Sequence, residues 1–176
     1  MRVRDHIAIS TAAAAVLRPW LGRRVLGLWA GGVLIDADHY LWFCRHERRL
    51  SLAAAVRFFN AGQAPAVQAT RALHRPVAAL PLLVLGLLRR RLRPLALGIG
   101  MHLALDAAHS ARMDAARLAA LERDGSSCQR CGARIAGLGT HLWRQPWLLP
   151  SYDVENLVSL CDGCHQRVHH AQAGAH

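Results

Sequence analysis

Two C-x-x-C pairs near the end of the chain constrain its fold more than any other feature. Cys128 and Cys131 form the first pair, and Cys161 and Cys164 form the second. Four thiolates at this spacing can close a tetrahedral zinc site, which supplies much of the stability of a module with little core of its own. The 29 residues between the pairs leave room for a β-hairpin.

The cysteine pattern also bears on the environment of the protein. Pairs at this spacing beside histidine and asparagine are typical of metal ligation rather than of a disulfide framework, and they predict a reducing compartment. The alternative is a set of free buried thiols, which Gly132 and Gly163 within the two knuckles disfavour. Cys44 stands alone and is interpreted as a packing or interface residue.

A second set of polar residues lies between and after the cysteines, namely His141, Asn156, His165 and His169. His165 and His169 are four residues apart. On a helix they therefore share one face, and both can reach a single metal ion. The sequence thus predicts a second metal site beside the zinc cysteines.

Residues 121–170 resemble the HNH endonuclease family. The resemblance rests on residues 121–132, which follow the pattern L-x-R-D-G-x-x-C-x-x-C-G, and on residues 155–169, which follow E-N-L-V-x-L-C-x-x-C-H-x-x-x-H. It implies a small ββα-metal module that cleaves nucleic-acid phosphodiester bonds.

The resemblance also implies a role for each polar residue. His141 would be the general base that activates water, and Asn156 would orient His141. His165 and His169 would bind a divalent catalytic metal (magnesium, manganese, zinc or nickel), which stabilises charge on the phosphate and the leaving oxygen.

One position departs from the family pattern. Most members place Asp or His directly before the general base as a further metal ligand, whereas this chain has Thr140. A threonine hydroxyl is a poor ligand, so the metal would be held by fewer protein groups. Because of this departure, a non-catalytic, zinc-stabilised binding module with His141 as a structural neighbour of the zinc remains an alternative.

Basic charge is concentrated outside this module. Residues 1–120 hold 17 arginines against 6 acidic residues, whereas residues 121–176 hold 5 of each. Attraction to phosphates must therefore come from the N-terminal part or from a few placed arginines. Within the module, Trp143, Arg144 and Trp147 can contact nucleic acid by stacking and charge, or the tryptophans can pack against the N-terminal helices.

Four apolar runs of 11 to 13 residues dominate the N-terminal part, at residues 7–17, 25–35, 76–88 and 94–105. Alanine and leucine prevail in them and β-branched residues are sparse, so we predict helices. Spanning a bilayer needs about 20 residues. The runs therefore indicate either core helices or segments associated with a membrane. A linking helix is predicted at residues 111–125.

Ionisable residues interrupt these apolar runs. Such groups are costly in apolar surroundings and are usually paired or bound to a ligand. His102 and Asp106 share one helix face, because four residues separate them. The alternative to a site is a set of helix caps and buried hydrogen-bonded pairs.

The order of these polar residues resembles the membrane-bound metal-dependent hydrolase family over about residues 1–110. That family begins with M-x-x-x-x-H and carries G-x-x-x-P-D-x-D-H, H-R and H-x-x-x-D, and Ile35 here replaces the proline. The resemblance implies a site for zinc, manganese or iron whose activated water hydrolyses an ester or a phosphoester. The implied ligands are His6, Asp36, His39, His74, His102 and Asp106.

We therefore predict a mainly α-helical N-terminal domain joined to a small ββα-metal zinc module. The expected boundaries are a helical, apolar domain at 1–110, a linking helix at 111–125, the zinc module at 126–170 and a tail at 171–176.

The leading functional interpretation is an HNH-type metal-dependent endonuclease, with DNA rather than RNA as its partner. It would need structural zinc and a divalent catalytic metal but no organic cofactor. The expected location is the cytoplasmic face, with association to the inner membrane left open. The alternatives are a hydrolase that uses the N-terminal His/Asp cluster and a non-catalytic zinc module.

Overall fold

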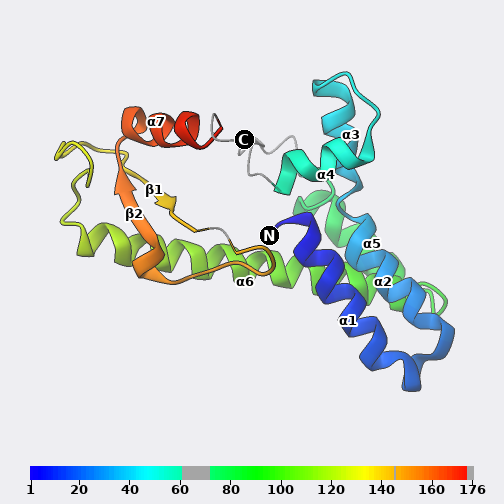
Figure 1. Ribbon diagram of the computed structural model, residues 1–176. Coiled ribbons are helices and arrows are strands. Elements are labelled where there is room, and N and C mark those ends of the chain that lie inside the picture. The colour runs from blue at the N-terminus through cyan, green and yellow to red at the C-terminus, as the bar shows by residue number, and fades with distance from the viewer. Residues whose placement is uncertain (61–71, 145, 174–176) are drawn as a thin grey trace. The chain divides into compact units, whose positions relative to one another are not determined.

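The computed structural model describes residues 1–60, 72–144 and 146–173. The chain divides into two compact units, Met1–Ala107 (unit 1) and Ala108–His176 (unit 2). Unit 1 is helical, and unit 2 contains a β-hairpin followed by a helix (Figure 1). The predicted fold class, a helical N-terminal part with a C-terminal ββα unit, is thus confirmed.

Unit 1 is built from helices that start at recognisable signals. The Asp5 carboxylate accepts a hydrogen bond from the Arg2 backbone N–H (3.3 Å) at the start of the first helix, and Pro76 begins the fifth, where its missing N–H costs nothing. The elements are α1 (Val3–Leu21), a 3₁₀ turn (Gly22–Arg24), α2 (Val25–Leu34), α3 (Ala37–His46), α4 (Leu52–Asn60), α5 (Pro76–Leu88) and the first part of α6 (Arg93–Arg123), whose residues from Ala108 onward belong to unit 2.

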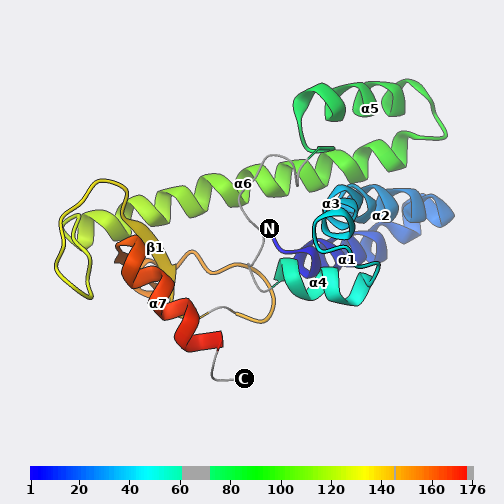
Figure 2. The same cartoon turned by 90° about the horizontal axis from the view of Figure 1, so that it is seen from above.

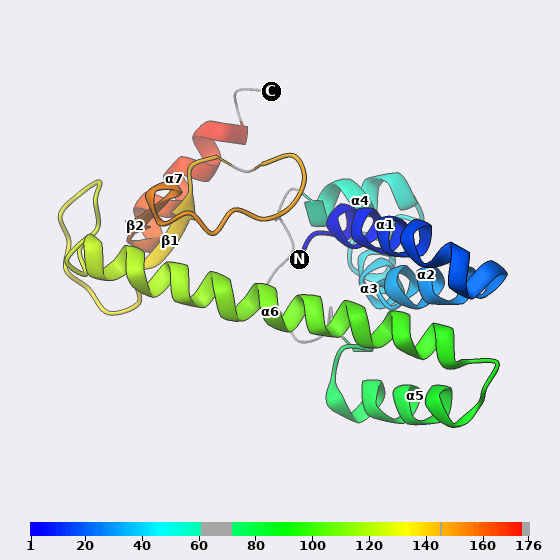
Figure 3. The same cartoon turned by 90° about the horizontal axis from the view of Figure 1, so that it is seen from below.

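Glycines let α2 and α6 approach backbone to backbone. A Cβ on Gly31 would clash with the Leu95 carbonyl oxygen, and a Cβ on Gly98 would clash with the Leu28 carbonyl oxygen. On the other side, α5 lies alongside the first part of α6 (Figures 2 and 3), where a Cβ on Gly86 would meet the Cβ of Ala96 at 2.6 Å. This close contact sets the positions of α2, which contributes the Gly32 carbonyl, and of α6, which carries His102 and Asp106, in the site described below.

We expect Gly98→Ala to destabilise unit 1 by about 2–3 kcal/mol, because the added methyl group forces two packed backbones apart. Gly100→Ala is the matched control on the same helix, since its Cβ would meet nothing nearer than Leu83 at 3.8 Å. That control should be neutral or should stabilise the helix by up to about 1 kcal/mol. Thermal and urea unfolding of the full chain provide the measurement. Equal stability of the two variants would contradict the close approach of α2 and α6.

The interior of unit 1 contains polar side chains as well as apolar ones. Asp5, His6, Ser10 and His102 are all almost fully buried, and His102 has no exposed surface. Buried polar groups need partners, so the packing of unit 1 depends on a network rather than on apolar burial alone. Within the described residues, none of the helices combines the length and apolar character needed to cross a membrane.

Unit 2 contains the hairpin of β1 (Gly139–Leu142) and β2 (Leu157–Leu160), followed by α7 (Asp162–Ala173). The strands are antiparallel, with His141 opposite Val158 and Thr140 opposite Ser159. Two small apolar clusters hold the unit together. One joins the hairpin to α7 through Cys128, Val158, Leu160, Cys164 and Val168, and the other joins it to α6 through Ala116, Ala120 and Leu157.

Two residues at the end of α6 fasten the hairpin. Arg123 donates hydrogen bonds to the carbonyl oxygens of Val154 and Leu157, both at 2.6 Å. The Asp124 carboxylate accepts a hydrogen bond from the Ser159 backbone N–H at 2.8 Å. Arg123 and Asp124 therefore have a structural role, because their hydrogen bonds hold β2 in place.

The predicted domain boundaries remain predictions. The residues expected to form a separate linking helix, 111–125, lie largely within the continuous helix α6. The end of the predicted tail, residues 174–176, lies outside the described residues.

Candidate metal centres

The four paired cysteines of unit 2 come together in one cluster. Their Sγ atoms all lie within 4.8 Å of one another, although the pairs are 30 residues apart in sequence. The Sγ atoms of Cys131 and Cys161 are 3.7 Å apart. A zinc ion with Zn–S bonds of about 2.3 Å separates its sulfurs by about 3.8 Å, so the cluster fits a structural zinc ion.

The electrostatics of the cluster also favour a cation. Burial raises the pKa of the Cys128 thiol, but backbone N–H groups of Cys161, Arg130 and Cys131 outweigh it and lower the pKa to about 6. A backbone N–H of Ala133 lowers the pKa of Cys131, yet the three neighbouring sulfurs outweigh this effect and raise it to about 11. A cation bound among the sulfurs would favour the ionised form of Cys131 by offsetting the effect of its neighbours.

A triad of histidines lies between β1 and α7. Ring nitrogens of His141, His165 and His169 all lie within 4.8 Å of one another. The ring centroid of His141 is 5.2 Å from that of His165 and 5.0 Å from that of His169. His141 is only 4% exposed, and its Nε2 has no hydrogen-bond partner among the described residues. Burial first, and the neighbouring histidines second, lower the pKa of His141, so its ring is neutral and can ligate a metal.

Asn156 lies close to the triad but contacts a different segment. Its side-chain oxygen accepts a hydrogen bond from the Arg144 N–H (2.9 Å), and its amide donates to the Arg144 carbonyl (2.7 Å). Its backbone carbonyl accepts a hydrogen bond from the Trp143 N–H (3.0 Å). Asn156 therefore fixes the chain just after His141 rather than bonding the His141 ring. Thr140 projects to the opposite face of the strand from His141.

The aromatic segment after β1 faces solvent. Trp143 is 54% exposed and Trp147 is 77% exposed. The Trp143 ring also contacts the edge of His141, with centroids 5.7 Å apart. The segment thus presents flat apolar faces beside the histidine triad.

In unit 1, three imidazoles converge on one carboxylate oxygen. The Nε2 atoms of His39, His74 and His102 lie 3.7, 3.5 and 3.5 Å from Asp36 Oδ1. The Nε2 atoms of His74 and His102 are 3.0 Å apart. Nitrogen and oxygen ligands of one tetrahedral zinc ion, with bonds of about 2.0–2.2 Å, stand about 3.3–3.6 Å apart. Asp36, His74 and His102 are thus close enough together to share a single ion, and His39 approaches the same Asp36 oxygen.

Two of the three rings are hydrogen-bonded through their other nitrogen. Nδ1 of His74 bonds to Asp38 Oδ2 (3.2 Å), and Nδ1 of His102 bonds to the Gly32 carbonyl oxygen (2.8 Å). Nδ1 of His39 lies 2.8 Å from Asp38 Oδ1 but forms no hydrogen bond with a described residue. An imidazole that donates through Nδ1 presents the lone pair of Nε2, as metal-binding histidines do. Asp38 and the Gly32 carbonyl therefore orient the rings of His74 and His102.

A second carboxylate closes the other side of this cluster. Asp106 Oδ2 lies 3.8 Å from the Nε2 atoms of both His74 and His102. Asp106 Oδ1 lies 3.0 Å from His6 Nε2 and 2.7 Å from the α-amino group of Met1. The His6 ring stacks on His102, with centroids 3.7 Å apart. His6 and Asp106 thus flank the convergent donors.

The acidic groups of the cluster have lowered pKa values. Burial raises the pKa of Asp36, Asp38 and Asp106, but hydrogen bonds and positive charge outweigh burial and lower all three; they come from the histidines and, for Asp106, also from the α-amino group of Met1. Burial lowers the pKa of His74, but its bonds to Asp36 and Asp38 raise it to about 9. Burial is the main reason that the pKa of His102 is lowered. A divalent cation supplies the same charge to the same donors, so these residues fit a metal ion.

The structure thus brings the candidate residues together in the cysteine cluster, the histidine triad and, in unit 1, three groups that overlap at Asp36, His74 and His102. Asp38 also belongs to the unit 1 cluster, although it was not among the ligands expected from the sequence. The D-x-D-H spacing could have indicated this role of Asp38, because a carboxylate directly before a histidine can reach its Nδ1. No feature of the sequence could have indicated the role of the Gly32 carbonyl.

Comparison with protein families, with characterised proteins and with solved structures finds no match to this chain.

Proposed function

We propose that unit 2 is a metal-dependent endonuclease of the HNH type that cleaves DNA. The observation that carries the proposal is the triad of His141, His165 and His169 on a ββα unit beside a four-cysteine cluster. The cysteines would hold zinc and keep the hairpin and α7 together. The triad would hold the catalytic divalent ion, which supplies a Lewis acid for the phosphate and lowers the pKa of attacking water.

The geometry suggests a different role for His141 than the sequence does. We assign His141 as the third metal ligand rather than as a free general base, because its buried ring belongs to the same group of donors as His165 and His169. This assignment also compensates for Thr140, since three imidazoles replace the ligand missing from that position. Asn156 would position His141 through the backbone of Arg144.

The exposed segment beside the triad supports a nucleic-acid substrate. Trp143 and Trp147 present faces on which bases can stack, and Arg144 can pair with a phosphate. Residues 121–176 have no net charge, so the arginine-rich residues 1–120 would supply the long-range attraction to DNA.

Plasmid nicking by the full chain with added magnesium or manganese tests this proposal. We expect His141→Ala to lower the nicking rate by about 100-fold or more and to weaken binding of the divalent ion, because a ligand is lost. The exposed histidine variant His46→Ala should nick like the wild type. No nicking with any divalent metal would favour the non-catalytic zinc module. If His141→Ala lost nicking activity but bound the divalent ion as tightly as the wild type, His141 would be the general base and not a metal ligand.

We propose, as a second candidate function, a metal-dependent hydrolase activity of unit 1. The observation that favours it is the convergence of three imidazoles on Asp36, two of which, His74 and His102, are oriented by hydrogen bonds through Nδ1. Hydrolysis of 4-nitrophenyl esters and phosphoesters separates the two candidates. Hydrolytic activity that is lost in His102→Ala and kept in His141→Ala belongs to unit 1. Activity that is kept in His102→Ala and lost in His141→Ala does not come from unit 1.

We also propose that the protein lies at the cytoplasmic face of the inner membrane. The four thiols require reducing conditions. Unit 1 exposes large apolar side chains on α5, including Val77 and Leu88, beside the arginine-rich turn at residues 89–93. Recovery of the full chain in the high-salt-washed membrane fraction would support this location, and recovery only in the supernatant would exclude it.

A further inference from the structure

We propose that the unit 1 site acts on a phosphoester that carries an apolar chain, an inference that rests on the second candidate function above. Two hollows border the metal-donor cluster. One is apolar and touches Asp36 and His39, and the other is cationic and touches Asp38. Together they match the two chemical halves of an amphiphilic phosphoester.

The apolar hollow is a cavity of about 350 Å³ between α1, α3 and α4, within the size range of small-molecule sites. Ile7, Val56 and Phe59 are among its apolar walls. The polar side chains that line it are Asp36, His39 and Tyr40, and the Tyr40 hydroxyl donates to the Leu50 carbonyl (3.1 Å). An apolar chain in this cavity would therefore lie against two of the metal donors.

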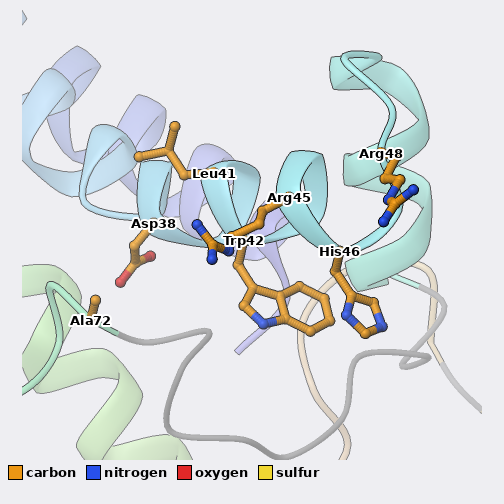
Figure 4. A pocket seen from close by; sticks show the side chains of 7 residues that line it. All are labelled: Asp38, Leu41, Trp42, Arg45, His46, Arg48 and Ala72. Atoms are coloured by element: carbon orange, nitrogen blue, oxygen red, sulfur yellow. The ribbon is translucent and has the colours of Figure 1, made fainter.

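The cationic hollow lies along α3 and has a volume of about 610 Å³. Figure 4 shows Trp42, Arg45 and His46 projecting from α3 around it, with Arg48 at one end and Asp38 at the other. Within the described part of the chain, neither Arg45 nor Arg48 forms an ion pair with a carboxylate. A guanidinium with no partner carboxylate suits a phosphate group, which it can bind through two parallel hydrogen bonds.

The end of α3 places Arg48 and Trp42 at this hollow. Arg48 has a φ of 49°, a left-handed conformation that commonly ends a helix at the residue after its C-cap, here Glu47. Trp42 stacks on His46, with centroids 4.5 Å apart, and gives the hollow a flat wall.

The reaction we infer consumes one water molecule and needs no oxidant. The P–O bond to the leaving alcohol breaks, and the oxygen of water joins phosphorus. One proton of the water goes to the alcohol, so a diester gives a monoester and an alcohol.

The test compares methyl and octyl 4-nitrophenyl phosphate with the metal-loaded full chain. Each methylene that enters the cavity should raise kcat/KM by about threefold to fourfold, so we expect the octyl ester to be preferred by about 100-fold or more. Binding of octyl phosphate and methyl phosphate to the metal-free chain, by calorimetry, should show the same preference. Equal values for the two chain lengths, with metal bound and hydrolysis measurable, would overturn the inference and leave the hydrolase function intact.

Variants of residues at the two hollows test which hollow binds the apolar chain and which binds the phosphate. Val56→Trp fills the cavity and should reduce the octyl-to-methyl ratio about tenfold or more, whereas Ala53→Trp, on the exposed face of α4, should keep it. Arg45→Gln should weaken binding of both phosphates by a similar factor of about ten. Unchanged binding of both phosphates in Arg45→Gln would overturn the phosphate assignment. Failure to bind any metal, measured as metal per chain, would remove the hydrolase function and this inference together.

Discussion

Cys164→Ser is expected to release zinc and unfold unit 2. Cys164 has no exposed surface and belongs to both the cysteine cluster and the small core that joins the hairpin to α7. Zinc binding in small modules contributes about 10–16 kcal/mol at neutral pH, and a module this small has no comparable apolar core to replace it. Zinc content should fall by one equivalent per chain, and hydrogen-exchange protection of β2 should disappear.

The matched control for this prediction is Cys44→Ser. Cys44 lies on α3 in unit 1 and belongs to none of the metal-donor groups in the described part of the chain. That variant should keep its zinc and its protected hairpin. If Cys164→Ser retained zinc and the same protection as Cys44→Ser, the cluster would not be a zinc site.

Asp36→Asn is expected to abolish metal binding by unit 1. One oxygen of Asp36 faces three imidazoles, so the amide keeps the size of the side chain while removing the charge that the donors share. Affinity for zinc or manganese should fall by about 1000-fold or more. In Asp38→Asn the metal affinity should fall by only about 10- to 100-fold, because Asp38 orients an imidazole and is not itself assigned as a ligand. Asp114→Asn should have no effect, because Asp114 is exposed and pairs with Arg117.

Calorimetric titration of the full chain with manganese measures these affinities. Manganese prefers the nitrogen and oxygen donors of unit 1 to the thiolates of unit 2. The number of ions bound per chain should fall by one in Asp36→Asn. Equal affinities in the Asp36, Asp38 and Asp114 variants would show that the cluster is a hydrogen-bonded core rather than a metal site.

The sequence predicted best where spacing along the chain determines contact. His165 and His169 share a face because a helix repeats every 3.6 residues, and each C-x-x-C pair forms a knuckle locally. It also indicated that His102 and Asp106 lie together, and they do. These relations depend on separations of three or four residues, which local geometry fixes.

Contacts between distant segments could not be predicted in this way. The hydrogen bond from His102 to the Gly32 carbonyl joins residues 70 positions apart and depends on the close approach of α2 and α6. Asn156 bonds to the backbone of Arg144 because of the hairpin register, which spacing alone does not set. The helix α6 runs past residue 110 for a local reason, because neither glycine nor proline interrupts residues 101–123.

The close glycine contact between α2 and α6 would affect which metal ions unit 1 binds. Gly31 and Gly98 bring two backbones together without intervening side chains, so neither helix can shift to suit an ion of a different radius. Asp36 follows α2 directly, and His102 lies one turn beyond Gly98 on α6. Their separation is therefore set by main-chain packing rather than by flexible side chains. Such a rigid frame would discriminate by ionic size and coordination geometry, and it would reject large ions such as calcium even where these are abundant.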